Sequence, residues 1–527
     1  MTTLPDFDSA VLSVMAVGKS APVQENVPIA SGEDEFLTGT AISLLAGTSV
    51  NGLGSVIKTT TASHHLLSVA AAGTRIADLK LEGTNGSTVL NNSGVVFGAG
   101  ATDGKVINTE LTGMSGMAVY ATGGATDGLL SGLYVHDLSG SYQNSSDIGL
   151  YTNAHRFIVA NSVLDGGAGI EVGVLQQLNS TGHKVTFNYI GAHTTYGAID
   201  YETTPRATRS LFMGNTVEDI DGATLGGTSG AGYYAVATGG QIVAFNHFKN
   251  TNISTTTETL APGAIGINDA YSPILINGNQ VEAASWYGTM VVSNTDAIVS
   301  IVNNAYLECL KTAIYIKSSS DAVALGNSIT ALTPTPLTQR GIAVNVVGGG
   351  PFSGVSTIAN RIRGTGGTAI DYNVTNNALV ASNNISETAG GGLKLAGGAG
   401  AVVSGNMVDV SAAATGVGLV LSNQTYTMVS GNVFKATNAK VITIAGTCTG
   451  TRIDRSNVIV GQANPMNFIE NNGTGCIVEM WGTAPPTVLQ HQVGDTVWNS
   501  APAVGQPIGW KCTAAGVPGT WTAMANL

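Results

Sequence analysis

The chain has 527 residues, of which 70 are glycine, 6% are aromatic and only 10% are charged. Because glycine and β-branched residues are poor helix formers, this composition argues against a helical protein and favours one that is nearly all β. The formal net charge of −12 leaves no basic surface for phosphates, so we expect no nucleic-acid partner. No apolar run approaches the roughly 20 residues of a membrane-spanning helix, so we expect no membrane association.

The N-terminal segment, residues 1–36, is predicted to cap the repetitive region of the chain. Its first residues, MTTLPDFDSAVLSV, carry acids where a secretory signal peptide would carry Lys or Arg. We therefore expect no signal peptide. The stretch DFDSAVLSVM is predicted to form a short helix or strand that closes the open N-terminal end of that region.

An internal repeat dominates the middle of the chain, from about residue 108 to residue 459. Its core is Asn-x-apolar after a short apolar strand, and the intervals are mostly about 23 to 33 residues. The asparagines are Asn161, Asn188, Asn215, Asn246, Asn279, Asn304, Asn327, Asn360, Asn383, Asn406, Asn432 and Asn457. Between them lie alternating segments such as GIEVG, AIDYE, AIGIN and AIYIK, which are typical of half-buried strands. The pattern predicts a coil of parallel strands, stacked about 4.8 Å apart.

The Asn-x-[Ile/Val] ladder and the Gly-Ile-x-Val strands resemble the right-handed parallel β-helix of the pectate-lyase-like superfamily, over roughly residues 37 to 463. The resemblance implies that the asparagines stack in a turn and bond the backbone groups left unpaired there. That superfamily includes lyases, hydrolases, epimerases and adhesins. The resemblance is therefore specific for the fold and weak for the chemistry.

Three acids in GIEVG and AIDYE form the candidate catalytic cluster: Glu171, Asp200 and Glu202. If the two apolar positions of each strand point inward, Asp200 and Glu202 point outward, about 7 Å apart. Aligning successive coils gives an outward column of Tyr151, Glu171, Asp200, Ala235 and Gly266. Carboxylates this close raise one another's proton affinity, which is the division into acid and base that glycoside hydrolysis needs. Asp371, in AIDYN, has no acidic neighbour and is expected to be an ordinary surface residue.

Residues around the acids are candidates for substrate binding, as stacking surfaces, charge partners or hydrogen-bonding groups. They are Tyr151, His155, His193, Arg206, Asn268, Asp269 and Trp286.

Two other functions remain open from the residues alone. A polysaccharide lyase would use a base and cations, for which Arg206, Lys184 and His193 are available. Calcium would then be the one expected cofactor, with Glu171, Asp200 and Glu202 as ligands. A non-catalytic adhesin or structural spike would bind a glycan without cleaving it. Hydrolysis is the leading prediction.

Residues 464–527 are predicted to form a linker and a small β module, because Pro and Gly turns separate short strands there. Four of the five tryptophans, expected in the core of this module, are Trp481, Trp498, Trp510 and Trp521. The segment resembles C-terminal parts of phage tailspikes. The resemblance implies a homotrimer on a virion tail, attached to another tail or baseplate protein, that hydrolyses internal linkages of a bacterial capsule or O-antigen.

The four cysteines lie far apart, without the spacing of a metal or redox site. They are Cys309, Cys448, Cys476 and Cys512. We expect them to be small buried apolar residues. No resident metal and no cofactor are expected for the hydrolase.

Overall fold

A computed structural model describes most of the chain beyond residue 25. The described residues are 26–28, 35–39, 41–59, 64–84, 92–139, 146–165, 167, 170–221, 230–251, 263–269, 273–292, 298–317, 321–331, 339–345, 352–373, 375–413, 415–437 and 440–527. The predicted cap element at residues 6–15 lies outside them. The chain divides into two compact units, unit 1 (Met1–Leu275) and unit 2 (Ile276–Leu527).

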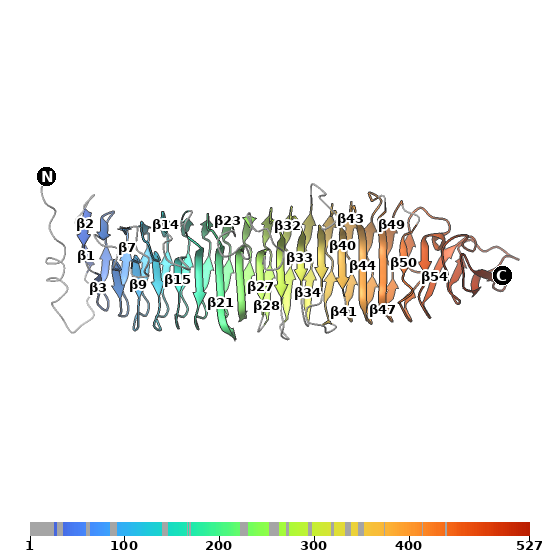
Figure 1. Ribbon diagram of the computed structural model, residues 1–527, viewed down its shortest axis with the longest axis horizontal. Coiled ribbons are helices and arrows are strands. Elements are labelled where there is room, and N and C mark those ends of the chain that lie inside the picture. Colours follow the sequence, from blue (N-terminus) through green and yellow to red (C-terminus); the bar gives the residue numbers. More distant parts are fainter. Residues whose placement is uncertain are drawn as a thin grey trace. The chain divides into compact units, whose positions relative to one another are not determined.

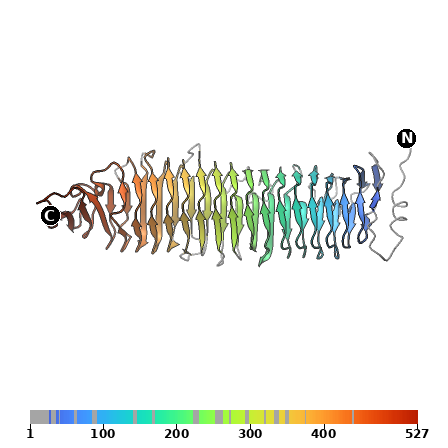
Figure 2. The same ribbon diagram turned by 180° about the vertical axis from the view of Figure 1, so that it is seen from behind.

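Each coil of unit 1 contributes one strand to each of three parallel sheets in turn. The strands stack coil upon coil, as the blue-to-green part of Figure 1 and the reverse view in Figure 2 show. The first sheet contains β1 (Asn26–Pro28), β4 (Ser49–Asn51), β7 (Arg75–Ala77), β10 (Lys105–Ile107), β13 (Leu129–Ser131), β16 (Ile158–Ala160), β19 (Lys184–Thr186), β22 (Leu211–Met213) and β25 (Ile242–Ala244). The second contains β2 (Glu35–Thr38), β5 (Val56–Thr59), β8 (Lys80–Glu82), β11 (Glu110–Thr112), β14 (Tyr134–His136), β17 (Val163–Asp165), β20 (Tyr189–Gly191), β23 (Thr216–Ile220) and β26 (His247–Thr251). The third contains β3 (Ile42–Leu44), β6 (Leu67–Val69), β9 (Val95–Phe97), β12 (Val119–Ala121), β15 (Ser146–Leu150), β18 (Val172–Gln177), β21 (Tyr196–Ala207), β24 (Ala231–Gly239) and β27 (Gly263–Asn268).

Unit 2 repeats the same order, and the unit boundary falls within β28 (Ile274–Asn277). Its first sheet contains β31 (Val299–Val302), β34 (Ala322–Leu325), β38 (Ser356–Ile358), β42 (Leu379–Ala381), β45 (Val402–Ser404), β48 (Met428–Ser430), β51 (Arg452–Ile453) and β54 (Ile477–Gly482). The second contains β29 (Gln280–Glu282), β32 (Ala305–Leu307), β35 (Ser328–Thr330), β39 (Arg361–Arg363), β43 (Asn384–Ser386), β46 (Met407–Asp409), β49 (Val433–Lys435) and β52 (Val458–Ile459). The third contains β30 (Tyr287–Val292), β33 (Thr312–Ile316), β36 (Arg340–Val344), β40 (Thr368–Asn373), β44 (Gly391–Ala399), β47 (Val417–Thr425), β50 (Ile442–Ile444) and β53 (Ile469–Asn471). A two-stranded sheet pairs β37 (Phe352–Ser353) with β41 (Thr375–Asn376).

The predicted fold class is confirmed: the protein is an all-β, right-handed parallel β-helix. Among the described residues the helical elements reduce to one 3-10 turn, η2 (Pro465–Phe468), so none is long and apolar enough to cross a membrane. All four cysteines are buried free thiols, as expected.

Within each unit, the asparagine ladder is a buried chain of hydrogen bonds at the corner between the first and second sheets. In unit 2, the Asn360 amide Nδ2 donates to Asn383 Oδ1 at 2.9 Å and to the Ala324 carbonyl at 2.9 Å. The Asn360 backbone N–H also donates to Asn383 Oδ1, at 3.0 Å. Each side chain thus satisfies backbone groups that the turn leaves without strand partners, which confirms the structural role predicted for these residues.

The predicted ladder is wrong at its first member. Asn161 is exposed and has a positive φ of 52°, and the next residue, Ser162, takes the ladder position. The Ser162 hydroxyl accepts the Leu133 N–H at 3.1 Å, while the Ser162 N–H donates to Asn188 Oδ1 at 3.0 Å. A serine completes the ladder in this coil because its oxygen also accepts a backbone N–H.

Parallel pairing continues past residue 463, where the sequence placed the end of the coils: β53 pairs with β50 and β54 with β51. Antiparallel pairing begins only with β55 (Thr496–Asn499), β56 (Gly509–Ala514) and β57 (Thr520–Ala523). The prediction that the four tryptophans form a core here is wrong. Trp481 is exposed and the other three are half-buried, and the Arg455 guanidinium lies over the rings of Trp481 and Trp498, at 5.1 and 4.8 Å.

The ladder predicts a sharp difference between two neighbouring asparagines, buried Asn383 and exposed Asn384. Replacing Asn383 with Ala removes the acceptor of the Asn360 N–H and side-chain amide, so we expect a loss of about 2–3 kcal/mol of local stability. Asn384→Ala is the matched control and should change stability by less than about 0.5 kcal/mol. Hydrogen exchange at the Asn360 amide measures both. Equal protection in the two variants would contradict a stabilising role for the ladder.

Candidate functional site

Strands of the third sheet do not alternate strictly between inward and outward side chains. In β21, a Cβ on Gly197 would lie 2.5 Å from Cγ1 of the fully buried Val217, so this position faces inward. The next residue, Ala198, is also fully buried, and Ile199 is only partly covered. Two consecutive inward residues shift the alternation by one position, which moves every later side chain to the opposite face.

Asp200 and Glu202 consequently point into the coil, and their predicted outward orientation is wrong. Asp200 is 0% exposed and Glu202 is 2% exposed. Ile199 and Tyr201, predicted to be inward, are the outward residues of this strand.

Asp200 belongs to a polar cluster inside the coil. Its Oδ2 accepts hydrogen bonds from Thr208 Oγ1 at 2.7 Å and from Gln241 Nε2 at 3.2 Å. Its Oδ1, together with Gln241 Oε1 and the Tyr233 hydroxyl, is buried without a hydrogen-bond partner. Burial raises the pKa of Asp200 to about 6, although the hydrogen bonds from Thr208 and Gln241 partly oppose this. The carboxyl therefore changes between its neutral and charged forms near pH 6.

Glu202 has a structural contact that accounts for its position. Its two carboxylate oxygens accept the backbone N–H of Asn179, at 2.9 and 3.1 Å. Leu178 and Asn179 both have positive φ, of 58° and 73°, in the turn after β18. Glu202 thus ties that turn to the next coil.

Glu171 does not join the other two acids, so the predicted three-carboxylate patch is wrong. Asp200 is paired in register with Gln176, five residues after Glu171, which is about 16 Å along the strand direction. Glu171 is half-buried ahead of β18, where its carbonyl accepts the N–H groups of Thr195 and Tyr196. The segments GIEVG and AIDYE therefore occupy different positions within their coils.

The tetrapeptide AIDY occurs twice and adopts opposite orientations. In β40, Ile370 and Tyr372 are fully buried, while Asp371 points outward, as expected, and forms ion pairs with Arg340 at 3.2 Å and Lys394 at 3.4 Å. The ion pairs leave Asp371 only 5% exposed. In β21 the same tetrapeptide begins one position later within its coil, so Asp200 points inward.

His193 is also inside the coil, not on the predicted binding surface. Its Nε2 lies 2.8 Å from Asp147 Oδ2, two coils away along the chain, and both side chains are fully buried. Gly173 lies in the coil between them, and a Cβ there would lie 3.3 Å from His193 Cε1. The glycine thus leaves the space through which the imidazole reaches the carboxylate.

The remaining candidates are His155, Trp286 and Arg206. His155 is half-buried at the corner after the third sheet, with Nδ1 hydrogen-bonded to Thr181 Oγ1 at 2.9 Å, and desolvation lowers its pKa. Trp286 belongs to unit 2, where Lys311 Nζ lies 4.6 Å from its ring centroid. The side chain of Arg206 lies outside the described part of the structure.

Tyrosines instead gather on the outward side of the third sheet in unit 1, where Tyr151 and Tyr196 are buried by their neighbours. We call this surface the tyrosine face, and it consists of Tyr120, Tyr151, Leu175, Tyr196, Ile199, Tyr201 and Tyr234. The rings of Tyr196 and Tyr234 stack at 5.5 Å, and those of Tyr120 and Tyr151 meet edge-on at 5.4 Å. Tyr201 is the most open of them, at 37% exposure.

Three predicted substrate-binding residues belong to this face or border it. Tyr151 is mostly covered within it, while Asn268 and Asp269 are half-buried at its end. Asn268 hydrogen-bonds to the Tyr234 hydroxyl, and Asp269 lies near the same ring. Tyr196, Tyr201 and Tyr234 were not among the residues predicted from the sequence. Gly197, which follows Tyr196 in the segment YGAIDY, was the sequence feature that could have indicated the shift in alternation.

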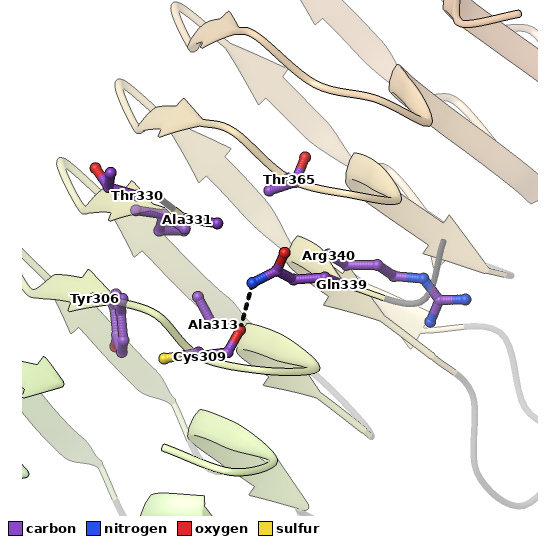
Figure 3. Close-up of a pocket in the computed structure, with 9 residues that line it drawn as sticks. Tyr306, Cys309, Ala313, Thr330, Ala331, Gln339, Arg340 and Thr365 are labelled. Carbon is purple, nitrogen blue, oxygen red and sulfur yellow. Dashed lines mark hydrogen bonds between the residues drawn. The ribbon is translucent and has the colours of Figure 1, made fainter. Parts of the chain in front are cut away.

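A small pocket in unit 2 is no ligand site. It is lined by Tyr306, Cys309, Ala313, Ile329, Thr330, Ala331, Gln339, Arg340 and Thr365. Gln339 Nε2 donates to the Cys309 carbonyl at 2.8 Å across it (Figure 3), while Gln339 Oε1 is buried without a partner. The space fits about one water molecule, which would satisfy that oxygen.

Within the described ranges, no group of three or more His, Cys, Asp and Glu side chains could hold a metal ion. The calcium site that a lyase would need stays a prediction.

Residues 290–458 match the family model described as the right handed beta helix region. A search of curated protein sequences finds no significant match. Among solved structures, the catalytic unit of a GH87 alpha-1,3-glucanase from Streptomyces thermodiastaticus is 12% identical, with a TM-score of 0.42 over 68% of this chain and 62% of that one. The Streptococcus pneumoniae adhesin PfbA is 11% identical (TM-score 0.36; 66% and 90%), and so is a tailspike protein of E. coli bacteriophage HK620 (TM-score 0.37; 94% and 86%). Similarities this low transfer no activity or partner to this chain.

The buried Asp200 predicts an unusual pH dependence of stability. Because its pKa of about 6 in the folded state exceeds the ordinary value, the folded protein retains a proton that the unfolded chain loses above about pH 4. The free energy of unfolding should therefore fall as pH rises from about 4 to 6, by at most roughly 3 kcal/mol. Asp200→Asn should remove this slope in denaturant melts, whereas Asp371→Asn should leave it in place. A slope that survives in Asp200→Asn would contradict the assignment.

Proposed function

We propose that the protein binds an extended bacterial surface polysaccharide along the tyrosine face of unit 1. The observation that carries the proposal is the cluster of tyrosines on the third sheet, in which Tyr201 is 37% exposed and Tyr234 is only partly covered, while Tyr151 and Tyr196 are buried beside them. A tyrosine ring offers an apolar face against which a sugar ring stacks, and a hydroxyl that bonds sugar hydroxyls. Because the rings are packed on one another, little side-chain entropy is lost when a ligand binds.

The groups at the end of the face suit a hydroxyl-rich ligand. Asn268 supplies amide donors and acceptors, and Asp269 supplies a carboxylate acceptor, both beside Tyr234. Ligand sites typically combine an apolar surface with a small number of polar groups that fix the orientation of the ligand.

Cleavage by the acids chosen from the sequence is not supported. Asp200 and Glu202 lie inside the coil, where no polysaccharide reaches them. Among the described residues, Glu171 and Asp269 are half-buried acids that border the tyrosine face. Asn268 is in the register column of Gln177, six residues beyond Glu171. That offset is about 20 Å, while paired glycosidase carboxylates lie about 5 to 9.5 Å apart. Binding without cleavage is therefore the function that the geometry supports best.

A homotrimer on a virion tail, as the resemblance to tailspikes implies, stays a proposal. A trimer is compatible with the proposed site, since the tyrosine face is formed by residues of one chain. Light scattering on the purified protein gives the oligomeric state directly.

The proposed function predicts that shortening the open tyrosines weakens glycan binding. Tyr201→Ala and Tyr234→Ala should each reduce affinity about three- to tenfold, because each removes one stacking surface. Affinity electrophoresis in gels that contain purified bacterial capsular polysaccharides or lipopolysaccharides measures the change. Tyr426→Ala is the matched control, since it removes an exposed tyrosine of unit 2 that belongs to neither proposed surface.

Unchanged binding in both tyrosine variants would refute the proposed surface. Release of reducing ends by the native protein from the glycan that it binds would show that binding is not the whole function. Asp200→Asn and Glu202→Gln would then test whether the buried acids take part in cleavage. Release that persists in these variants would exclude them, and loss of release would show that the reaction depends on them.

A further inference from the structure

Successive coils of unit 1, from Asp78 to Phe245, each have a corner residue with a left-handed backbone conformation. It lies between the first and second sheets, directly before the ladder position. The corner residues and their φ angles are Asp78 (56°), Asn108 (48°), Gly132 (67°), Asn161 (52°), Phe187 (59°), Gly214 (68°) and Phe245 (55°). In the described part of unit 2, residues with positive φ at the corner between the first and second sheets include Asn303, Gly326, Ala359, Ser382, Gly405 and Gly431, none of which is aromatic; the aromatic Tyr426 (φ 55°) lies at the corner between the third and first sheets.

Phe187 and Phe245 are unexpected at such a position. Glycine, asparagine and aspartate tolerate a positive φ, whereas a bulky side chain is destabilised there by about 1–2 kcal/mol. The two rings do not compensate by joining the core, since they are 59% and 62% exposed. The two rings therefore contribute little to the hydrophobic core.

The two phenylalanines lie on alternate coils, with Gly214 at the corner between them. Strands β19, β22 and β25 lead into these corners and pair in register, Thr186 with Met213 and Met213 with Ala244. Two strand spacings separate the phenylalanines, about 10 Å. A Cβ on Gly214 would lie 2.6 Å from Phe187 Cδ1, so the glycine leaves room for the Phe187 ring to lie against its backbone.

Hydrogen-bonding groups border the rings on the second sheet. Tyr189, Thr216 and His247 form one outward register column, each two residues after a corner residue. The Tyr189 hydroxyl donates to Glu218 Oε1 at 2.8 Å. The corner therefore combines separated aromatic surfaces with polar side chains.

We propose that Phe187 and Phe245 form a second saccharide-binding site, distinct from the tyrosine face, on which alternate sugar rings of an extended glycan stack. The ligand class rests on the proposed function. Because Gly214 separates them, the two phenylalanine rings match a polysaccharide in which every second sugar presents the same face. The area of the two rings is far smaller than the roughly 800 Å² that each partner buries in a stable protein interface.

The test compares Phe187→Asn, Phe245→Asn and the double variant, because asparagine occupies this corner in the coils of Asn108 and Asn161. Affinity electrophoresis with long capsular polysaccharides or lipopolysaccharides should show at least threefold weaker binding for each single variant. Binding of short oligosaccharides from the same glycans to the tyrosine face should not change. Thermal stability should stay equal or rise, because the backbone strain is relieved.

Equal binding of long glycans by the native protein and the double variant would overturn the proposal, while leaving the tyrosine face intact. Loss of binding in the phenylalanine variants but not in Tyr201→Ala would instead remove the tyrosine face and keep this site. A change of oligomeric state in the double variant, measured by light scattering, would show that the corner contacts a second copy of the chain and would also overturn the proposal.

Discussion

The constraint on which the rest of the structure depends is the stacking of one coil on the next in exact register. Parallel backbone pairing alone tolerates slippage, but the buried amides at one corner do not. Asn360 bonds Asn383 in the following coil through both its backbone and its side chain, so each turn is held at a defined height and phase. A buried amide left unpaired is strongly unfavourable, which makes a slipped register costly.

That register determines which side chains meet. Because Gly197 and Ala198 both face inward, Asp200 enters the coil beside Thr208 and Gln241, while Tyr201 turns outward. The polar cluster inside and the tyrosine face outside are thus two consequences of one local shift. A carboxylate inside a coil affects stability through its protonation, whereas aromatic residues outside offer contact area to a ligand.

Both proposed surfaces use positions where side chains repeat from coil to coil. Leu175, Ile199 and Tyr234 share one register column of the third sheet, and the Tyr234 ring stacks on Tyr196, which lies three residues out of register in the preceding coil. Phe187 and Phe245 are separated by one coil because Gly214 occupies the corner between them. A polymeric ligand suits such surfaces, since its own repeat can match the strand spacing, and weak contacts then add along the chain.

The sequence by itself determined the β-helix, the asparagine ladder from Asn188 onward and the burial of the cysteines, since these follow from periodicity and composition. It did not determine the face on which Asp200 lies. The letters AIDY occur at both 198–201 and 369–372 with opposite orientations, because alternation gives the spacing of side chains but not their phase. Likewise, Asn161 and Asn188 look equivalent in the sequence, yet only Asn188 is in the ladder. The phase is decided by pairing with the neighbouring coils, a non-local interaction that only the tertiary structure contains.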